Sequence, residues 1–182
     1  MKNIEIIYKK VEDLTKKELD FMNSARLKKY GKDSKVDFKK EDIEAIFILL
    51  KENKKIVAFG MLKPVKINYL GRSYTILGMG RGMAINQGKG YGRILSAARI
   101  LYIKKTGKST VAFTSTKNKK FFEKSGFQFE KDFIKRFQYK DPKTGKIKID
   151  SDGHGVYING KDNLIKKMLK TKSIAYTNAD FW

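Results

Sequence analysis

The chain has 182 residues, of which 41% are hydrophobic and none is cysteine, and its formal net charge is +22. This length and apolar content suit one domain with one sizeable core, and the lack of cysteine excludes a disulfide framework, a thiolate nucleophile and a cysteine-ligated metal. The sequence shows no targeting signal and no apolar run of about 20 residues. We therefore expect a cytoplasmic protein with no metal and no membrane partner.

The positive charge comes mainly from lysine, which supplies 35 of the 41 basic residues, whereas arginine supplies six. Such a charge attracts phosphates and nucleic acid. Specific recognition of phosphates and bases, however, favours the forked guanidinium of arginine over scattered lysines. The composition of this basic protein therefore favours a solvated charged surface, and nucleic acid is the less favoured partner.

In the first half, periodicity and turn residues predict a strand, a helix and a meander, in that order. The strand covers "NIEIIYKKV", and Thr15 with Glu18 forms a capping box before a helix from about Lys16 to Tyr30 that stops at Gly31. The charged segment "KDSKVDFKKED" is a loop or a short helix. Three apolar runs joined by short polar turns then predict an antiparallel meander over Ala45 to Leu50, Ile56 to Lys66 and Ser73 to Ile85.

The second half alternates helices and strands. Its first helix ends at Gly107 and has a predicted apolar face of Ile94, Leu95, Ala98, Leu101 and Tyr102. Then come a strand "STVAFTS", a short helix "KNKKFFEKSG" closed by Gly126, a long strand "FQFEKDFIKRFQYK", a turn "DPKTGK" into "IKID", a strand "GVYI", a helix near Asp162 to Leu169 and a strand "SIAY". The predicted class is α/β, with a mixed, mostly antiparallel sheet flanked by helices in one domain over residues 1–182.

The segment "INQGKGYGRIL" places Gly88, Gly90 and Gly92 directly before the apolar run of a helix. A strand that passes through glycines into a helix presents unpaired backbone N–H groups at the positive end of the helix dipole. Glycine lets a phosphate oxygen approach the main chain, so these residues suit a pyrophosphate; the alternative is that they only permit a tight turn. The segment does not end in the Gly-Lys-Ser/Thr of a P-loop, so it is not a P-loop. A dinucleotide-binding fingerprint would follow a parallel strand in a βαβ unit, whereas this segment follows a meander, so that motif does not fit either.

Gln87, Gly90 and Gly92 match Arg/Gln-x-x-Gly-x-Gly/Ala, and the segment resembles the acyl-coenzyme A loop of the GNAT superfamily of N-acetyltransferases. Downstream, "TSTKNKKFFEKSGF" resembles the strand, the helix and the closing "FYEKLGF" element of the same superfamily. The two matches cover roughly residues 73–129. The resemblance implies one GNAT-like acyltransferase domain with acetyl-coenzyme A as cosubstrate.

The resemblance also implies which residues bind the coenzyme. Backbone amides of residues 88–93 would hold the pyrophosphate, and the strand before them would pair with the pantetheine arm after separating from its neighbour. The implied coenzyme-binding residues are Met83, Ala84, Ile85, Gln87, Gly88, Lys89, Gly90, Tyr91, Gly92, Arg93, Asn118 and Phe122.

The expected catalytic groups depart from the family pattern. Phe122 stands where the family usually has a tyrosine that protonates the thiolate, and the strand "SYTILGMGRGMAI" has no carboxylate to act as general base. Ser115 stands at the position of a frequent asparagine, with Asn118 one helical turn later, and helix capping is the alternative role of both. His154 lies in "DGHGV", where the glycines predict a loop, and its alternative is an incidental surface position. Ser115, Asn118 and His154 are therefore the catalytic candidates.

Arg81 is the charged residue of the strand before the glycines, and with Arg26 it is assigned to the acceptor side. Arg81 would suit an acidic acceptor group, or it would pair with a buried carboxylate. The sequence thus predicts an N-acetyltransferase that is a monomer or a homodimer and acts on a primary amine. The alternatives are a GNAT-like modifier of nucleic acid or aminoacyl-tRNA and a non-catalytic acyl-coenzyme A-binding module.

Overall fold

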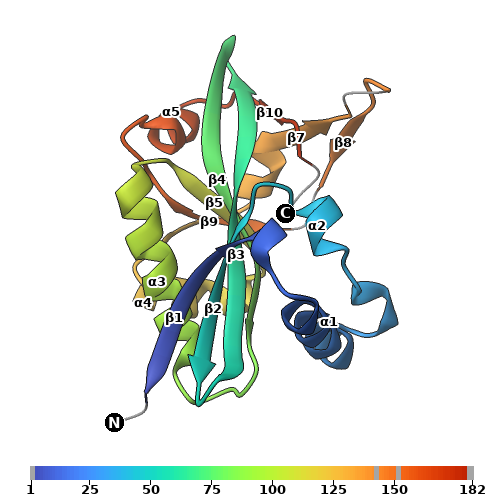
Figure 1. Cartoon of the computed structure of the whole chain (residues 1–182). Helices are drawn as coiled ribbons and strands as arrows, with labels where there is room; N and C mark the ends of the chain where they lie inside the picture. The colour runs from blue at the N-terminus through green and yellow to red at the C-terminus, as the bar shows by residue number, and fades with distance from the viewer. Residues whose placement is uncertain (1–2, 142–143, 151–152, 180–182) are drawn as a thin grey trace. The chain divides into compact units, whose positions relative to one another are not determined.

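The computed structural model describes residues 3–141, 144–150 and 153–179. The chain forms two compact units, which we call unit 1 (residues 1–63 and 81–98) and unit 2 (residues 64–80 and 99–182). Strands β3 (Lys55–Tyr69) and β4 (Arg72–Ala84) and helix α3 (Tyr91–Thr106) each contribute residues to both units. Figure 1 labels the elements along the chain.

Unit 1 is built on an antiparallel arrangement of β1 (Ile4–Lys10), β2 (Ile46–Glu52) and the first half of β3, which lie side by side in Figure 1. Residues 57–63 of β3 are buried without alternation, which indicates that both faces of this strand are covered. Helices α1 (Lys16–Tyr30) and α2 (Phe38–Glu41) each bring an apolar side chain to the core, Met22 and Phe38.

Helix α1 confirms the local prediction at both ends. The Glu18 N–H donates to Thr15 Oγ1 over 3.2 Å, and the Thr15 N–H donates to Glu18 Oε2 over 3.1 Å, which is the reciprocal capping box. Gly31 ends the helix with φ of 89°. Because both signals act within one turn of the chain, sequence alone was sufficient to place them.

Unit 2 contains a mixed sheet in the order β6-β9-β5-β4-β3-β10-β7-β8, in which β4 with β5 and β10 with β7 are parallel pairs. Its core includes Ile67 and Tyr69 of β3, Phe133, Phe137 and Met168. The remaining elements are β5 (Thr110–Thr114), α4 (Lys119–Lys124), β6 (Gln128–Glu130), β7 (Phe137–Lys140), β8 (Ile147–Ile149), β9 (His154–Ile158), α5 (Leu164–Lys170) and β10 (Ala175–Thr177). Pro142 and Lys143 of the predicted turn before β8 lie outside the described residues.

The prediction of one long strand over "FQFEKDFIKRFQYK" is wrong. β6 ends at Glu130, Asp132 takes φ of 55°, and a 3-10 turn over Phe133–Arg136 precedes β7. Aspartate tolerates this left-handed conformation better than most residues. Phe133 and Ile134 of the turn are both buried, so β6 pairs with β9 while β7 pairs with β8 and β10. Burial against the core outweighed the strand propensity of the segment.

The predicted apolar face of α3 needs one correction. Leu101 is 66% exposed, whereas Arg99 is only 4% exposed and lies on the buried stripe with Leu95 and Ala98. The Arg99 Nη2 donates to the carbonyl of Gly80 over 2.6 Å, and burial lowers the pKa of its guanidinium to about 10. A pattern of apolar residues alone does not predict that Arg99 lies on the buried face, although Arg99 continues that face one helical turn after Leu95.

The Glu18 carboxylate leads to a prediction about pH. Burial raises the pKa of Glu18, but hydrogen bonds from Lys9 Nζ, the Thr15 N–H and Lys51 Nζ outweigh burial and lower that pKa from 4.5 to about 2. Because the pKa is depressed in the folded state, the stabilisation is complete above about pH 4.5 and is lost as the pH falls toward 2. We expect Glu18→Gln to lower the free energy of unfolding at pH 6 by about 2 kcal/mol.

Urea unfolding of Glu18→Gln and of the unchanged protein at several pH values checks this expectation. The difference between the two proteins should shrink between pH 4.5 and pH 2. The exposed Glu5 of β1 provides the control, since Glu5→Gln should change the stability by less than about 0.5 kcal/mol. A Glu18→Gln difference that stays constant with pH would contradict the role of the lysine contacts.

Candidate functional site

The glycine segment between β4 and α3 forms an exposed turn in unit 1. Gly88 and Gly90 take φ of 79° and 80°, and a Cβ added to either would meet no atom within 4 Å. The Gly90 carbonyl accepts from the Arg93 N–H over 3.0 Å and from the Ile94 N–H over 3.2 Å, which starts the helix. Glycine is therefore required here for the left-handed backbone, and the space beside it is open.

The charges around this turn favour an anion. Lys89 before α3 and Arg93 in its first turn are exposed, and that first turn holds no acidic residue. The helix has 16 residues, long enough for a developed dipole whose positive end lies at this turn. Exposed amides, two cationic side chains and the helix dipole together suit a phosphate or pyrophosphate.

Tyr91 anchors the start of α3. Its side chain is 1% exposed, and its hydroxyl donates to Glu52 Oε2 at the end of β2 over 2.8 Å, which raises the pKa of the phenol. The Tyr91 side chain therefore lies in the interior of unit 1, so a ligand at the turn would contact the backbone of Tyr91 and not its ring. Of the other predicted coenzyme residues before the turn, Met83 is buried, whereas Ile85 and Gln87 are exposed.

Strand β4 pairs with β5 through a short parallel ladder within unit 2. The parallel ladder consists of Leu77 opposite Thr110 and Gly78 opposite Val111, although β5 continues to Thr114. Beyond this point the Gly80 carbonyl accepts a hydrogen bond from Arg99, and Arg81 takes φ of 54°. An open strand edge can pair with an extended ligand through its main chain. The separation of β4 from its neighbour that the sequence resemblance implies stays a prediction.

The three catalytic candidates lie near one another at the end of β5 in unit 2. Ser115 directly follows the strand, and its carbonyl accepts from the Asn118 N–H over 3.1 Å. The Asn118 Nδ2 donates to Thr114 Oγ1 over 2.8 Å, and His154 of β9 pairs with Thr114 across the sheet. Neither Ser115 nor Asn118 caps a helix through its side chain. The capping alternative therefore does not explain these two residues.

His154 is not in a loop, as the flanking glycines suggested, but is the first residue of β9. Its Nδ1 accepts the Asp132 N–H over 3.0 Å, so the neutral ring carries its hydrogen on Nε2, which contacts Thr116 Oγ1 over 2.7 Å. Both ring nitrogens are thus engaged. His154 thereby ties β9 to the segment after β5.

Phe122 lies in a group of aromatic rings on α4 and the turn that follows it. Its ring meets those of Phe121 and Phe127 edge to face, with centroids 5.1 Å and 5.6 Å apart. Such pairs stabilise by about 1 kcal/mol beyond the area that they bury. Phe122 therefore packs against one aromatic ring of α4 and one that follows the helix.

Arg81 pairs with a buried carboxylate, which decides between its two predicted roles. Its Nε lies 2.9 Å from Oδ2 of Asp42, a fully buried residue, and its Nη2 lies 3.1 Å from Oε2 of Glu41. Lys63 Nζ is 3.6 Å from Asp42 Oδ1 and donates to the Glu41 carbonyl over 3.1 Å. Sequence reasoning missed Asp42 and Lys63, because nothing in the charged run "FKKEDIE" marks one carboxylate as buried.

Arg26, the second residue assigned to the acceptor side, makes contacts within its own part of unit 1. Its Nε donates to the Ser34 carbonyl over 3.0 Å, and its guanidinium lies 5.7 Å from the centre of the Tyr30 ring. Burial and the charge of Arg81 lower the pKa of Arg26, and the nearby carboxylates of Asp42 and Glu41 partly oppose this. The charges of Arg81, Asp42 and Glu41 therefore affect Arg26. The hydrogen bond from Arg26 to Ser34 stabilises the loop after α1.

The described residues also bear on metal binding and on membrane insertion. Within residues 3–141, 144–150 and 153–179, no group of three or more histidine, aspartate or glutamate side chains could hold a metal ion. The same residues include no helix with the length and apolar character needed to span a bilayer.

Comparison with known proteins identifies the fold. No protein-family profile and no curated protein matches the sequence. Solved structures do match: the GNAT family N-acetyltransferase YhbS from Escherichia coli in complex with CoA has a TM-score of 0.63 and 10% identity over 97% of this chain and 90% of its own. Escherichia coli ElaA has a TM-score of 0.56 and 14% identity over 85% of this chain and 98% of its own. An N-acetyltransferase from Staphylococcus aureus Mu50 has a TM-score of 0.53 and 17% identity over 85% of this chain and 95% of its own. The chain therefore has the GNAT fold.

Proposed function

We propose that this chain, a protein with the GNAT fold, is an acetyl-coenzyme A-dependent N-acetyltransferase that acts on a primary amine, and that residues 1–182 work as one domain. The observation that carries the proposal is the exposed turn at Gly88 and Gly90, which opens into α3 with no acidic residue in the first turn of that helix. A neighbour of the same fold was solved with CoA, which supports a coenzyme as the anion bound at this turn.

The coenzyme would be held mainly by backbone. Amides of residues 88–93 would bind the pyrophosphate, with Lys89 and Arg93 adding charge. The strand end at Met83, Ala84 and Ile85 would pair with the pantetheine arm in the manner of an added strand.

Asn118 and Phe122 also belong to the proposed coenzyme site. The Asn118 Nδ2 donates to Thr114 Oγ1, and the Asn118 side-chain oxygen is the atom that we propose for contact with the coenzyme. Phe122 offers an apolar ring, which suits contact with the aliphatic parts of the arm.

The chemistry requires little from the protein beyond positioning. The amine nitrogen attacks the thioester carbonyl, the C–N bond forms, the C–S bond breaks, and the amine proton leaves to water or to the thiolate. Holding a neutral amine beside the thioester supplies much of the acceleration. The Ser115 hydroxyl and the second Nδ2 hydrogen of Asn118 are the proposed hydrogen-bond donors to the leaving sulfur, whereas His154 holds Thr116 in place.

The charge network of Arg81 supports a cationic acceptor over an acidic one. Asp42 and Glu41 neutralise the Arg81 guanidinium, and the Glu41 side chain remains 48% exposed. An acidic acceptor would have to compete with two carboxylates for Arg81, while an ammonium group would find Glu41 accessible. The acceptor amine would therefore arrive protonated and lose a proton before it reacts.

A coenzyme A release assay with acetyl-coenzyme A tests the proposal against pooled small amines, peptides and charged tRNA. Release with an amine or peptide pool supports the N-acetyltransferase. Release with charged tRNA alone would favour the nucleic-acid modifier, and coenzyme binding without turnover on any pool would favour the non-catalytic binding module.

Replacing Phe122 with tyrosine places a phenol where GNAT enzymes usually have one. Because the ring is retained, we expect the edge-to-face contacts with Phe121 and Phe127 to persist and the stability to change by less than about 1 kcal/mol. Turnover should rise about tenfold if protonation of the thiolate limits the rate, within the range of general acid catalysis. Steady-state kinetics measures this, and a fall in kcat at unchanged KM for acetyl-coenzyme A would show that another group serves as the acid.

A further inference from the structure

One side of the unit 2 sheet presents an unusual mixture of side chains to solvent. On β3, alternation places Ile67 and Tyr69 in the core and leaves Lys66 and Asn68 exposed on the opposite side. The strand register places side chains of β10, β7 and β8 on that same side. We call this surface the β10 face, and it consists of Lys66, Asn68, Gln138, Lys140, Ile147, Ile149 and Tyr176.

The apolar members of the β10 face are exposed to an extent that folding does not require. Tyr176 is 41% exposed, Ile147 is 52% exposed and Ile149 is 59% exposed. The register places Tyr176 opposite both Asn68 and Gln138, and Gln138 opposite Ile149, so these side chains form one row across four strands. Apolar groups that lie together on a surface mark an interaction site more often than single exposed residues do.

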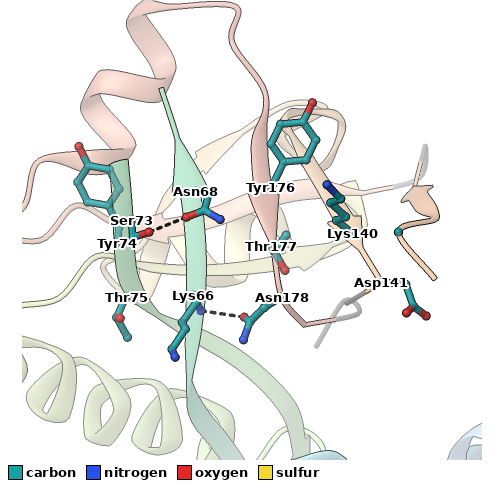
Figure 2. A pocket seen from close by; sticks show the side chains of 11 residues that line it. Lys66, Asn68, Ser73, Tyr74, Thr75, Lys140, Asp141, Tyr176, Thr177 and Asn178 are labelled. Atoms are coloured by element: carbon teal, nitrogen blue, oxygen red, sulfur yellow. Dashed lines mark hydrogen bonds between the residues drawn. The ribbon is translucent and has the colours of Figure 1, made fainter. Parts of the chain in front are cut away.

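A pocket of about 560 Å³ lies on this face and extends onto β4 (Figure 2). Ser73 Oγ donates to Asn68 Oδ1 over 2.6 Å, and Asn178 Oδ1 accepts from the Lys66 N–H over 3.0 Å, so the polar floor is hydrogen-bonded. Neither the Lys66 nor the Lys140 ammonium group has an ion-pair partner in the part of the chain that the structure describes. The pocket thus combines a hydrogen-bonded floor with the ammonium groups of Lys66 and Lys140 and the carboxylate of Asp141.

The charge of unit 2 determines what kind of occupant suits the face. Unit 2 contains 22 lysines and arginines against eight aspartates and glutamates, whereas unit 1 contains 19 against 11. A second copy of this chain would bring the same excess of positive charge and would be repelled. The complementary partner is a polyanion, and its phosphates or carboxylates would neutralise Lys66 and Lys140.

We propose that the β10 face binds single-stranded nucleic acid. A base stacks on the Tyr176 ring, the amides of Asn68 and Gln138 offer donors and acceptors to base edges, and Lys66 and Lys140 contact phosphates. Ile147 and Ile149 add apolar contact beside the ring. An acidic peptide would satisfy the lysines but would leave the stacking surface and the amide groups without a matching partner. This inference does not depend on the proposed acetyltransferase activity.

Fluorescence anisotropy with a labelled oligouridylate of about 12 nucleotides tests the proposal on the full chain at low salt. We expect Tyr176→Ala to weaken binding about tenfold and Tyr176→Phe to retain most of it, because the stacking ring persists. Lys66→Gln with Lys140→Gln should reduce the slope of log affinity against log salt by about 1.4, since each phosphate contact contributes about 0.7 for a single strand. The matched control is Lys104→Gln with Lys105→Gln, two basic residues in the last turn of α3.

Each result supports or overturns the assignment. Loss at Tyr176→Ala together with a slope change confined to the Lys66 and Lys140 pair supports it. If the two lysine double variants reduced the slope of log affinity against log salt equally, the binding would be non-specific attraction to positive charge. Binding that is insensitive to Tyr176→Ala would lead to the same conclusion. A polyglutamate peptide that binds as tightly and with the same dependence on Tyr176 would assign the face to an acidic protein, and no binding at low salt would also overturn the proposal. Circular dichroism verifies that each variant folds.

Discussion

Gly90→Asp should weaken the binding of acetyl-coenzyme A about tenfold or more, which corresponds to at least about 1.4 kcal/mol. Gly90 takes φ of 80°, a conformation that disfavours any side chain, and the space beside it is open. The new carboxylate would therefore lie where the pyrophosphate is proposed to bind and would repel it. Isothermal titration calorimetry measures the affinity.

The control for this substitution is Gly71→Asp in the turn between β3 and β4. Gly71 has φ of 72° and also has no atom within 4 Å of an added Cβ, so the backbone strain and the added charge are matched. We expect Gly71→Asp to lower the stability and to leave coenzyme affinity unchanged. If both variants bound the coenzyme as the unchanged protein does, the assignment of the glycine turn would be wrong.

Asp42→Ala should lower the free energy of unfolding by about 3–5 kcal/mol, because breaking a buried ion pair leaves the partner charges uncompensated. Asp42 is fully buried and lies 2.9 Å from Arg81 Nε and 3.6 Å from Lys63 Nζ. With Asp42 replaced, two positive side chains of low exposure would face each other, with Glu41 as the remaining carboxylate partner of Arg81. Equilibrium urea unfolding measures the change.

The exposed pair of Lys16 and Asp20 on α1 serves as the control. These groups lie 2.6 Å apart, but their side chains are 90% and 62% exposed, so Asp20→Ala should cost less than about 1 kcal/mol. Asp42→Asn separates charge from packing, since it keeps the shape of the side chain and removes the negative charge. Equal small effects for Asp42→Ala and Asp20→Ala would show that Arg81 and Lys63 find other partners when Asp42 is absent.

The elements that sequence predicted well are those whose signals lie within a few residues. The Thr15 and Glu18 capping box and Gly31 bounded α1, and the short polar turns separated β2, β3 and β4. Gly88 and Gly90 likewise take positive φ directly before a helix, so the sequence alone predicted the proposed phosphate turn. In each case the deciding interaction is local, and the types of the residues involved determine the local conformation.

Tertiary structure decided the features that depend on residues far apart in the chain. The burial of Phe133 and Ile134 divided a predicted long strand into β6 and β7, and pairing with β5 placed His154 on a strand. The burial of Asp42 beside Arg81 depends on the approach of α2 to β4, which no local pattern encodes.

The β10 face also depends on contacts between residues that are far apart in the sequence. Sequence alone determined that this protein has a GNAT-like order of elements, a glycine turn before α3 and a strong excess of lysine. Lys66, Lys140 and Tyr176 are far apart in the sequence and share one surface only because β10 pairs with both β3 and β7. A two-residue repeat indicates which side chains of a strand share a face, but long-range pairing determines which strands form that face.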